Sequence, residues 1–563
     1  MRGQRRDDLQ PGRFDENRVV EQGAPGLDWQ PSPTTPGIQS SGEHTVVTKY
    51  LVNHGTEKGF RPGDGPGAMP YTYPAGELQR VIVQEENTAQ SETATDKLGR
   101  TVYTKTYAST PDSALTQYVY DLFGRVKYVI QPEGWEIARI SGLTSTVLDH
   151  YAFQYVYDAR GRVIEKKVPG ADVVYMVYDK LDRVVLTQDG RQRNLTTKEW
   201  LFTKYDDLNR PIVTGIYASN ATRSVLQDTL NLRPDFSESR SGASYSTLQG
   251  YTNTAFPNLT ASGVTVHSVT YYDDYDFDRT GTPDKTYLPD AENFPEHSPS
   301  NLLRGQVTAV KVRVLEKDTD MPDWLLTITF YDKYSREIQT QADNHLKGKD
   351  ITWQEYNFAG ELLLSKHTHT GYFLDQPPGP DFDPYERSAT IFQSYTYDPR
   401  GRLLRIEQKT EDPDNPGHET EYTTLSEHRY DVLGQMTGKN LGYESGSQFL
   451  QIGDYQYNIR GWLSKFNQPS TATPGGTYRD LLAFELHYNT GASAIVSGTP
   501  NLFNGNISAM QWQVLGEGKE IRAFAFTYDQ MNRLTSAKYR EKTSSSWNVN
   551  SGRYDVTNLV YDR

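Results

Sequence analysis

The sequence predicts an all-β chain built from antiparallel β-hairpins, and three observations support this prediction. A hexapeptide of the form Tyr-Asp-x-x-Gly-Arg returns along the chain, so the protein is built by repetition. Tyrosine occurs 39 times, glycine 45 times and proline 30 times, which suits many short strands joined by tight turns. Long amphipathic helical patterns are almost absent.

The hexapeptide has clear copies and looser ones. The clear copies are Tyr120-Asp121-Leu122-Phe123-Gly124-Arg125, Tyr157-Asp158-Ala159-Arg160-Gly161-Arg162 and Tyr397-Asp398-Pro399-Arg400-Gly401-Arg402. Looser copies are Tyr178-Asp179 closed by Arg183, and those that begin at Tyr205, Tyr331, Tyr356, Tyr430, Tyr457 and Tyr528. A slot at Asp96 to Arg100 lacks the tyrosine.

Each copy is interpreted as the turn of a hairpin. Asp398-Pro399-Arg400-Gly401 places Asp, Pro and Gly where a type I turn favours them, and a left-handed residue after such a turn gives a bulged hairpin loop. The Asp carboxylate accepts amide hydrogens of the turn, and the Arg lies near enough to pair with it. The alternative, a functional Asp/Arg site in every copy, is less favoured because site chemistry rarely recurs throughout an array.

The glycine slot of the hexapeptide tests this interpretation. It holds glycine or a residue that tolerates positive φ, and never a β-branched residue. The occupants are Gly99, Gly124, Gly161, Gly360, Gly401, Gly434 and Gly461, otherwise Asp182, Asn209, Asn532 and Ser335. The slot therefore follows the requirement of the backbone.

The sequence also predicts strands between the copies of the hexapeptide. Val163 to Val168 and Val173 to Tyr178 are predicted hairpin partners, joined by a turn at Pro169 to Asp172. The second of these strands is apolar at odd and even positions, so both of its faces should be covered or lined by aromatic rings.

Five segments are expected along the chain. Residues 1–45 should be disordered or extended because they are rich in Pro, Gly, Ser and charge. Residues 46–115 should form a β segment that leads into the array, and residues 116–217 a first part of the array. Residues 218–330 should be an inserted β region or degenerate repeats. Residues 331–563 should resume the array, with surface loops at Asp375 to Tyr385 and Thr410 to Thr423.

Charge and composition exclude several classes of function. A net charge of -14 argues against nucleic acid or an anionic membrane surface as the main partner. No apolar run approaches the roughly 18 residues of a membrane span. No signal peptide is visible, because Met1 to Asp8 has no apolar segment behind it. Without cysteine, the chain has neither disulfides nor a thiol nucleophile.

Two clusters of residues are candidate metal sites. His367 and His369 would share one face of a strand, yet no third ligand is identifiable, so ordinary surface histidines are favoured. Asp274, Asp276 and Asp278 alternate like the ligands of a calcium loop, but the EF-hand pattern fails at the positions that follow. A solvated acidic loop is favoured there, and a nonstandard calcium site is the alternative. No other cofactor and no catalytic residue is expected.

The tyrosines of the hexapeptide also allow two interpretations. Their rings could stack on sugars or hold an unfolded cargo by apolar contact. Packing of each hairpin against the next is favoured for Tyr157 and Tyr397, because both occupy a fixed place relative to the turn.

The repeated hexapeptide and its flanks resemble the RHS or YD-repeat family. The wording of the stretches Tyr157 to Arg193, Trp200 to Tyr217 and Tyr73 to Val102 is similar to the Bacteroidota branch of that family, and the resemblance extends from about Val46 to the end. It implies an irregular spiral of antiparallel hairpins that forms part of a hollow shell or barrel. The uneven spacing of the copies also favours a spiral over a β-propeller, whose blades need an even period.

The same resemblance implies a function. In bacterial toxins of this family the shell encloses a C-terminal toxin, and in teneurins a related barrel belongs to a cell-surface adhesion protein. The expected function is therefore a non-enzymatic segment of a secreted or surface-exposed shell, whose partner is its own downstream effector. A cell-surface adhesion or glycan-binding protein is the alternative, and an enzyme is third. The chain stops within a motif at Tyr561-Asp562-Arg563, so we expect a fragment of a longer protein.

Overall fold

The computed structural model describes most of the chain. The described residues are 13–15, 18–31, 44–107, 113–242, 248–315, 323–373, 385–411, 420–444, 448–469, 481–514, 520–542, 546–548 and 553–561. About 47% of the residues lie in strands and 9% in helices, and the main sheet is antiparallel. The predicted all-β fold class is therefore confirmed. Most of the predicted loop at Asp375 to Tyr385, and much of that at Thr410 to Thr423, lies outside the described residues.

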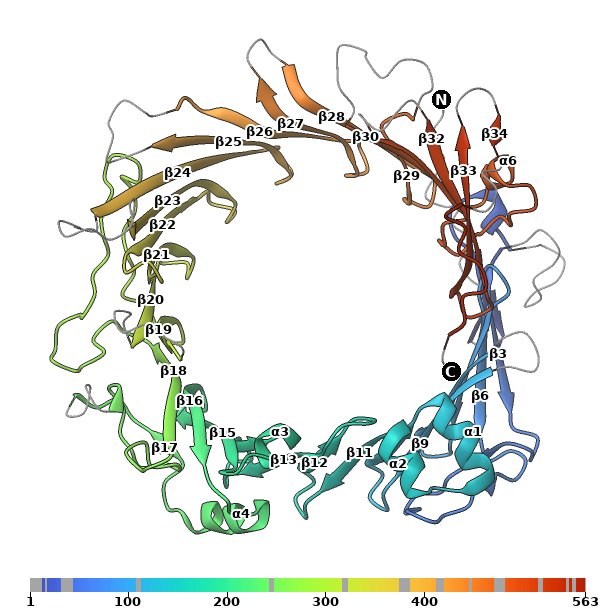
Figure 1. Cartoon of the computed structure of the whole chain (residues 1–563), viewed down its shortest axis with the longest axis horizontal. Helices are drawn as coiled ribbons and strands as arrows, with labels where there is room; N and C mark the ends of the chain where they lie inside the picture. Colours follow the sequence, from blue (N-terminus) through green and yellow to red (C-terminus); the bar gives the residue numbers. More distant parts are fainter. Residues whose placement is uncertain are drawn as a thin grey trace. The chain divides into compact units, whose positions relative to one another are not determined.

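The chain forms two compact units. The terminal unit contains residues 1–156, 167–171 and 428–563, and the central unit contains residues 157–166 and 172–427. The terminal unit thus combines both ends of the chain, whereas the central unit is nearly continuous in sequence. Figure 1 labels the elements of both units along the chain.

The central unit is an antiparallel series of strands. Each strand pairs with the next, except that β16 skips to β18 and the short β17 pairs in parallel with β15. The strands are β12 (Val163–Lys167), β13 (Val174–Tyr178), β14 (Val184–Gln188), β15 (Glu199–Asp206), β16 (Pro211–Ala218), β17 (Ser237–Glu238), β18 (Val264–Tyr272), β19 (Val307–Arg313), β20 (Trp324–Tyr331), β21 (Glu337–Asp343), β22 (Lys349–Tyr356), β23 (Leu362–Phe373), β24 (Tyr385–Tyr397), β25 (Leu403–Glu411) and β26 (Thr423–Tyr430). The predicted hairpin around Pro169 is β12 and β13, in which Glu165 pairs with Tyr175.

The terminal unit contains a first run of strands from the beginning of the chain and a last run from its end. The first run is β1 (Arg13–Asp15), β2 (Arg18–Gln22), β3 (Val46–Val52), β6 (Gln79–Gln84), β7 (Gln90–Thr95), β8 (Thr101–Tyr107), β9 (Ser113–Tyr120), β10 (Val126–Ile130) and β11 (Ala152–Tyr157), beside the two-stranded sheet of β4 (Lys58–Gly59) and β5 (Tyr71–Thr72). The last run is β27 (Met436–Glu444), β28 (Gln448–Tyr457), β29 (Leu463–Phe466), β30 (Leu482–His487), β31 (Ala509–Val514), β32 (Ile521–Tyr528), β33 (Leu534–Lys542) and β34 (Trp547–Asn548).

Short helices occupy connections between strands. They are η2 (Leu27–Trp29), α1 (Pro132–Ser141), α2 (Ser145–Tyr151), α3 (Gly190–Arg193), α4 (Arg223–Leu232) and α6 (Ala492–Ile495). α1 begins at a proline, and α2 begins after Thr144, whose side chain accepts a hydrogen bond from the amide of Val147. α1 and α2 contribute Trp135 and Val147 to a small core with β9 and β10.

The main core of the central unit lies on the strands from β13 to β21. Its buried side chains include Trp200 and Phe202 of β15 and Tyr271 of β18. Leu226 and Leu230 of α4, with Tyr251 and Phe277 from the connections, pack on these strands. The residues between β16 and β19, for which an inserted region or degenerate repeats were expected, thus supply two strands of the sheet and part of its cover.

The connections of each unit lie on two opposite sides of its sheet, at the two ends of the strands. In an antiparallel series every second connection falls on the same side. The copies of the hexapeptide, such as those between β13 and β14 and between β15 and β16, occupy one side, which we call the motif edge. Connections such as those between β14 and β15 lie on the opposite side. The motif edge is therefore where repeated chemistry gathers in each unit.

Candidate functional site

Each turn at the motif edge is closed by its own aspartate. In the copy after β11, Oδ1 of Asp158 accepts hydrogen bonds from the amides of Arg160 (2.9 Å) and Arg162 (3.0 Å). Oδ2 of Asp158 accepts a hydrogen bond from Nε of Arg162 at 2.7 Å. The amide of Asp158 donates to the carbonyl of Arg162, and that of Gly161 to the carbonyl of Asp158. One carboxylate thus satisfies the amides of the turn and fixes the arginine.

The same Asp-Arg ion pair recurs in both units. The pairs are Asp96–Arg100, Asp121–Arg125, Asp158–Arg162, Asp179–Arg183, Asp206–Arg210, Asp332–Arg336, Asp398–Arg402 and Asp529–Arg533. Three further turns keep the backbone and replace the ion pair. They have Asn357 with Glu361, Asp431 with Gln435, and Asn458 with Trp462.

The glycine slot has left-handed backbone in every copy. Its φ is 81° at Gly124, 85° at Gly161 and 79° at Gly401, and it remains positive where another residue fills the slot, as at Asp182 (65°) and Asn209 (64°). Beside the turn the strand register shifts, so that Tyr178 faces Val184 and Tyr397 faces Leu403 across a β-bulge.

Several tyrosines of the motif end a strand and contact the preceding turn. Tyr178 ends β13, and its hydroxyl donates to the carbonyl of Val163 at 2.6 Å. The guanidinium of Arg162 lies 4.7 Å from the centre of the Tyr178 ring, a cation–π distance. Nη1 of Arg162 also donates to the carbonyl of Asp179 at 3.1 Å. Arginine and tyrosine therefore tie one turn to the next.

We call this chain of contacts the Tyr-Asp-Arg ladder. Arginine-over-tyrosine contacts between neighbouring turns are Arg100–Tyr120, Arg162–Tyr178, Arg183–Tyr205, Arg210–Tyr272, Arg336–Tyr356 and Arg533–Tyr561. Hydroxyl bonds back to the previous hairpin are Tyr120 to Thr101, Tyr178 to Val163, Tyr205 to Val184, Tyr272 to Pro211, Tyr331 to Val307, Tyr488 to Leu463, Tyr528 to Ile507 and Tyr561 to Leu534. Burial raises the pKa of Tyr205, and the nearby Arg183 offsets part of that rise.

Sequence reasoning missed two tyrosines of the ladder, Tyr272 and Tyr488, and Tyr488 bonds back to Leu463. Tyr272 and Asp273 lie in the interval that seemed to lack the motif, yet Tyr272 ends β18 and bonds back to β16. Asp273 receives a bidentate pair from Arg210, with N–O distances of 2.9 and 2.7 Å. The Tyr-Asp dipeptide was the available signal. It was obscured because the turn after it is replaced by the long connection from residue 274 to residue 306.

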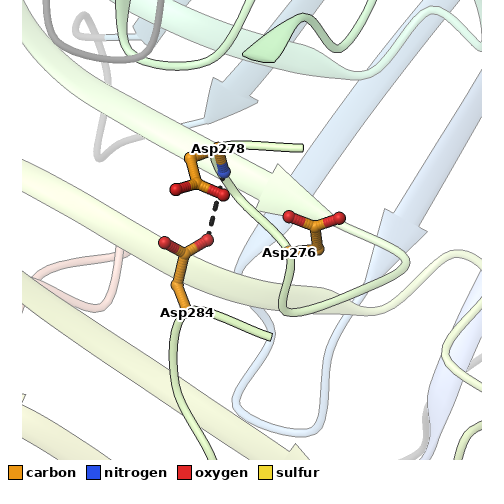
Figure 2. A group of neighbouring side chains, drawn as sticks. All are labelled: Asp276, Asp278 and Asp284. Carbon is orange, nitrogen blue, oxygen red and sulfur yellow. Dashed lines mark hydrogen bonds between the residues drawn. The ribbon is translucent and has the colours of Figure 1, made fainter. Parts of the chain in front are cut away.

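That connection holds the acidic residues considered for calcium. Asp276, Asp278 and Asp284 each offer a ligand oxygen within 4.8 Å of the others, and Figure 2 shows their three carboxylates together. Asp274, which the sequence grouped with them, instead pairs with Arg279 at 2.7 Å. The side chain of Thr280 holds the pKa of Asp278 below its usual value.

The amides of the same loop already hold these carboxylates. Asp284 accepts from the amide of Asp278 at 3.1 Å, the dashed contact in Figure 2. Asp276 accepts from the amides of Thr280 and Gly281, each at 3.0 Å. The three carboxylates are thus the residues that could hold a cation here, and their present contacts order the loop.

The two histidines lie on β23 and contact neighbouring β22. Nδ1 of His367 lies 2.9 Å from Oγ1 of Thr352, and Nδ1 of His369 lies 2.5 Å from a carboxylate oxygen of Asp350. These are cross-strand contacts, and the acidic loop is the group of three that the described residues offer for a metal.

A buried ion pair joins β15 to the segment that covers it. Nζ of Lys204 lies 2.6 Å from Glu238, and both side chains are fully buried. Lys204 also donates to the carbonyl of Ala255, and Glu238 accepts from Thr252 and the amide of Ala255. Burial lowers the pKa of Lys204, against the attraction of Glu238. The pair is fully hydrogen-bonded, which such a buried charge requires.

Comparison with known proteins gives limited information. No family model matches the chain, and no curated protein matches it. Among the 41 matching chains of solved structures is the crystal structure of TcdB2-TccC3-TEV, with 13% sequence identity and a TM-score of 0.28. That match covers 93% of this chain and 24% of the other, so the chain spans about a quarter of the length of its match. Within the described residues, no helix is long and apolar enough to cross a membrane.

Proposed function

We propose that the chain is a non-enzymatic segment of a β-shell that encloses an effector encoded downstream in the same protein. The observation that carries this proposal is the Tyr-Asp-Arg ladder, which joins successive hairpins at the motif edge. The role is physical, since a continuous wall of hairpins excludes solvent and proteases from what lies behind it. The sequence resemblance to RHS or YD-repeat proteins, in its Bacteroidota form, supports the same proposal.

The ladder suits a wall for two reasons. Each added hairpin pairs with the edge strand of the previous one, which leaves few open strand edges. Each arginine also contacts the following turn, so the orientation of one hairpin constrains the next. Arg183 shows this, because it pairs with Asp179 and donates to the carbonyls of Asp206 and Phe236.

We further propose that the protein acts outside the cell or at its surface, with its own effector as principal partner. The adhesion or glycan-binding alternative has no specific observation in its favour, so we do not adopt it. Nucleic acid is not an expected partner at a net charge of -14.

Small-angle scattering of the purified chain tests whether a wall encloses space. We expect a distance distribution shifted to long vectors, as a hollow particle gives. A distribution that fits a filled particle of this mass would contradict the proposal.

Protection of a cargo tests the function more directly. A fluorescent reporter fused after Arg563 should resist a protease that destroys the free reporter. Replacing Arg162 and Arg183 together by alanine should open the wall and restore cleavage, whereas Arg191→Ala, in α3 and away from the ladder, should not. Equal cleavage of the fused and free reporter would rule out enclosure by this chain.

A further inference from the structure

Residues 18–31, which precede β3 in the chain, include a buried tryptophan that contacts the last run of the terminal unit. Trp29 is only 3% exposed, and its Nε1 donates to the carbonyl of Phe503 at 2.9 Å. Its ring lies edge-on to Trp462 (6.1 Å between centroids) and to Phe503 (5.6 Å). The guanidinium of Arg460 lies 5.2 Å from the Trp29 ring and 4.9 Å from the Trp462 ring. Residues of the last run thus form a socket for one side chain of the N-terminal segment.

Polar contacts surround this socket and also join the two ends of the chain. Asn87 accepts from the amide of Phe503 at 2.8 Å. Glu85 accepts from Asn504 at 3.1 Å and from Asn532 at 3.0 Å. Further contacts are Asn489 with Asp28, Arg460 with Glu86, and the ring of His44 stacked on that of Phe503.

The local sequence fits the socket. Gly26 has a φ of 116°, and a Cβ there would lie 2.7 Å from the Trp29 ring and 3.2 Å from Cγ2 of Ile459. A Cβ on Gly23 would lie 2.6 Å from the carbonyl of Trp29. Both glycines are therefore needed for the chain to fold back around the tryptophan. Upstream, the segment is held to the first run, because Glu21 and Gln22 of β2 pair with β3.

No strand pairing in the described residues joins the first run to the last run of the terminal unit. The first run extends by pairing from β1 to β11, and the last run from β27 to β34. The contact between them therefore depends on side chains, chiefly one aromatic socket with a polar rim. Such a contact opens more readily than a sheet ladder, because few backbone hydrogen bonds must break.

We propose that residues 18–31 form a detachable clasp that holds the first and last runs of the terminal unit together. Trp29 is the residue that binds the last run, by filling the socket. The pairing of β2 with β3 keeps the segment attached to the first run when Trp29 leaves. When Trp29 leaves its socket, the two runs separate while each keeps its own strand pairing. This inference rests on contacts within one unit and does not depend on the shell function.

Distance measurement between spin labels tests the clasp in the full chain. The protein has no cysteine, so two introduced cysteines are the only labelling sites. Exposed Leu98 lies in the first run between β7 and β8, and exposed Lys538 lies on β33 of the last run. The pair Leu98→Cys and Lys538→Cys should give one narrow distance distribution. Adding Trp29→Ala should broaden it at least twofold towards longer distances.

Matched variants separate opening from unfolding. Leu27→Ala is the control, because Leu27 is in the same helical turn and is 94% exposed. Glu85→Ala removes only polar contacts, so it should broaden the distribution less than Trp29→Ala does. Hydrogen exchange of β7 and β33 should remain as in the parent protein. An unchanged distance distribution in Trp29→Ala would overturn the proposal. Loss of hydrogen-exchange protection in β7 and β33 of both Trp29→Ala and Glu85→Ala would overturn it as well, because the variants would then be unfolding.

Discussion

Two parts of the central unit use the same turns but differ in how their sheet is covered. The strands from β13 to β21 carry a core in which Trp200, Phe202 and Tyr271 are at most 1% exposed, beneath residues supplied by the connections around β17. From β22 to β25, the buried apolar side chains among the described residues are Trp353 and Phe392. We call these the covered part and the single-layer part.

In the single-layer part, lysine side chains supply much of the cover, beside the connection from residue 274 to residue 306, where Asp290 pairs with Lys366 and the carbonyl of Leu288 accepts from Nε1 of Trp353. Nζ of Lys366 lies 5.2 Å from the Trp353 ring and 5.3 Å from the Phe392 ring, and Nζ of Lys409 lies 4.3 Å from that of Phe392. Long lysine stems bury apolar surface while the charge stays near water. The turns of the two parts are alike, so the hexapeptide sets hairpin geometry and the covering segments determine how much core forms.

The largest expected difference in unfolding free energy is between two Lys→Ala variants, one in each part. Each of these lysines pairs with an acidic residue of a connection that lies over the sheet. Lys204→Ala in the covered part leaves Glu238 buried without its partner, which costs about 3–5 kcal/mol of unfolding free energy. Lys366→Ala should cost only about 1 kcal/mol, since Lys366 and its partner Asp290 keep 19% and 12% exposure. Urea unfolding measures both. Equal losses would show that the two lysines are equivalent and that the covered part is not special.

The next difference compares two phenylalanines that are equally buried. Phe202 and Phe392 are each 1% exposed, but protein core surrounds the first and lysine stems cover the second. Phe202→Ala should cost about 3–5 kcal/mol, because a rigid cavity remains. Phe392→Ala should cost about 1–3 kcal/mol, because the lysines can move into the space. Thermal unfolding of the two variants shows which one loses more stability. A larger loss of stability in Phe392→Ala would contradict the idea that the lysines move into the space left by the ring.

The sequence predicts the local part of this comparison well. The residue types in the glycine slot predict the left-handed backbone directly, because few residue types tolerate a positive φ. The two strand-like stretches on either side of the turn at Pro169 correctly predicted the β12–β13 hairpin. Tyr178 and Tyr397 could be placed beside the turn for the same reason, since their distance from it along the chain is fixed.

Contacts between distant residues could not be predicted in the same way. Lys204 meets Glu238 across 34 residues and Trp29 meets Phe503 across 474, and no local pattern encodes either partner. Trp29 also lies in a segment whose composition suggested an extended or disordered chain. Asp284 escaped notice as a companion of Asp276 and Asp278 because a turn of the loop, not regular spacing, brings it to them.

A smaller effect is expected at a turn of the single-layer part. Gly360 has a φ of 89°, and a Cβ there would meet nothing within 4 Å, so backbone strain alone determines the cost of a substitution. Gly360→Val should lower the unfolding free energy by about 1–3 kcal/mol. Gly360→Asn should lower it by less than about 1 kcal/mol, because Asn tolerates the left-handed region, as Asn209 does in the covered part. Chemical denaturation distinguishes them, and equal costs would mean that the slot does not select for positive φ.

The smallest effect concerns the turn carboxylates and pH. Burial acts to raise the pKa of Asp332, but the amide and guanidinium of Arg336 and the amide of Tyr334 outweigh it and hold that pKa below its usual value. A lowered carboxyl pKa stabilises the fold above the unfolded-state pKa of about 4, and this stability is lost as the pH falls through the folded-state value. Asp332→Asn should therefore be less stable than the parent at pH 7, by about 1 kcal/mol. The gap should close below about pH 4, as the parent carboxylate takes up its proton. A gap that stays constant from pH 7 to strongly acidic solution would show that the charge of Asp332 does not stabilise the turn.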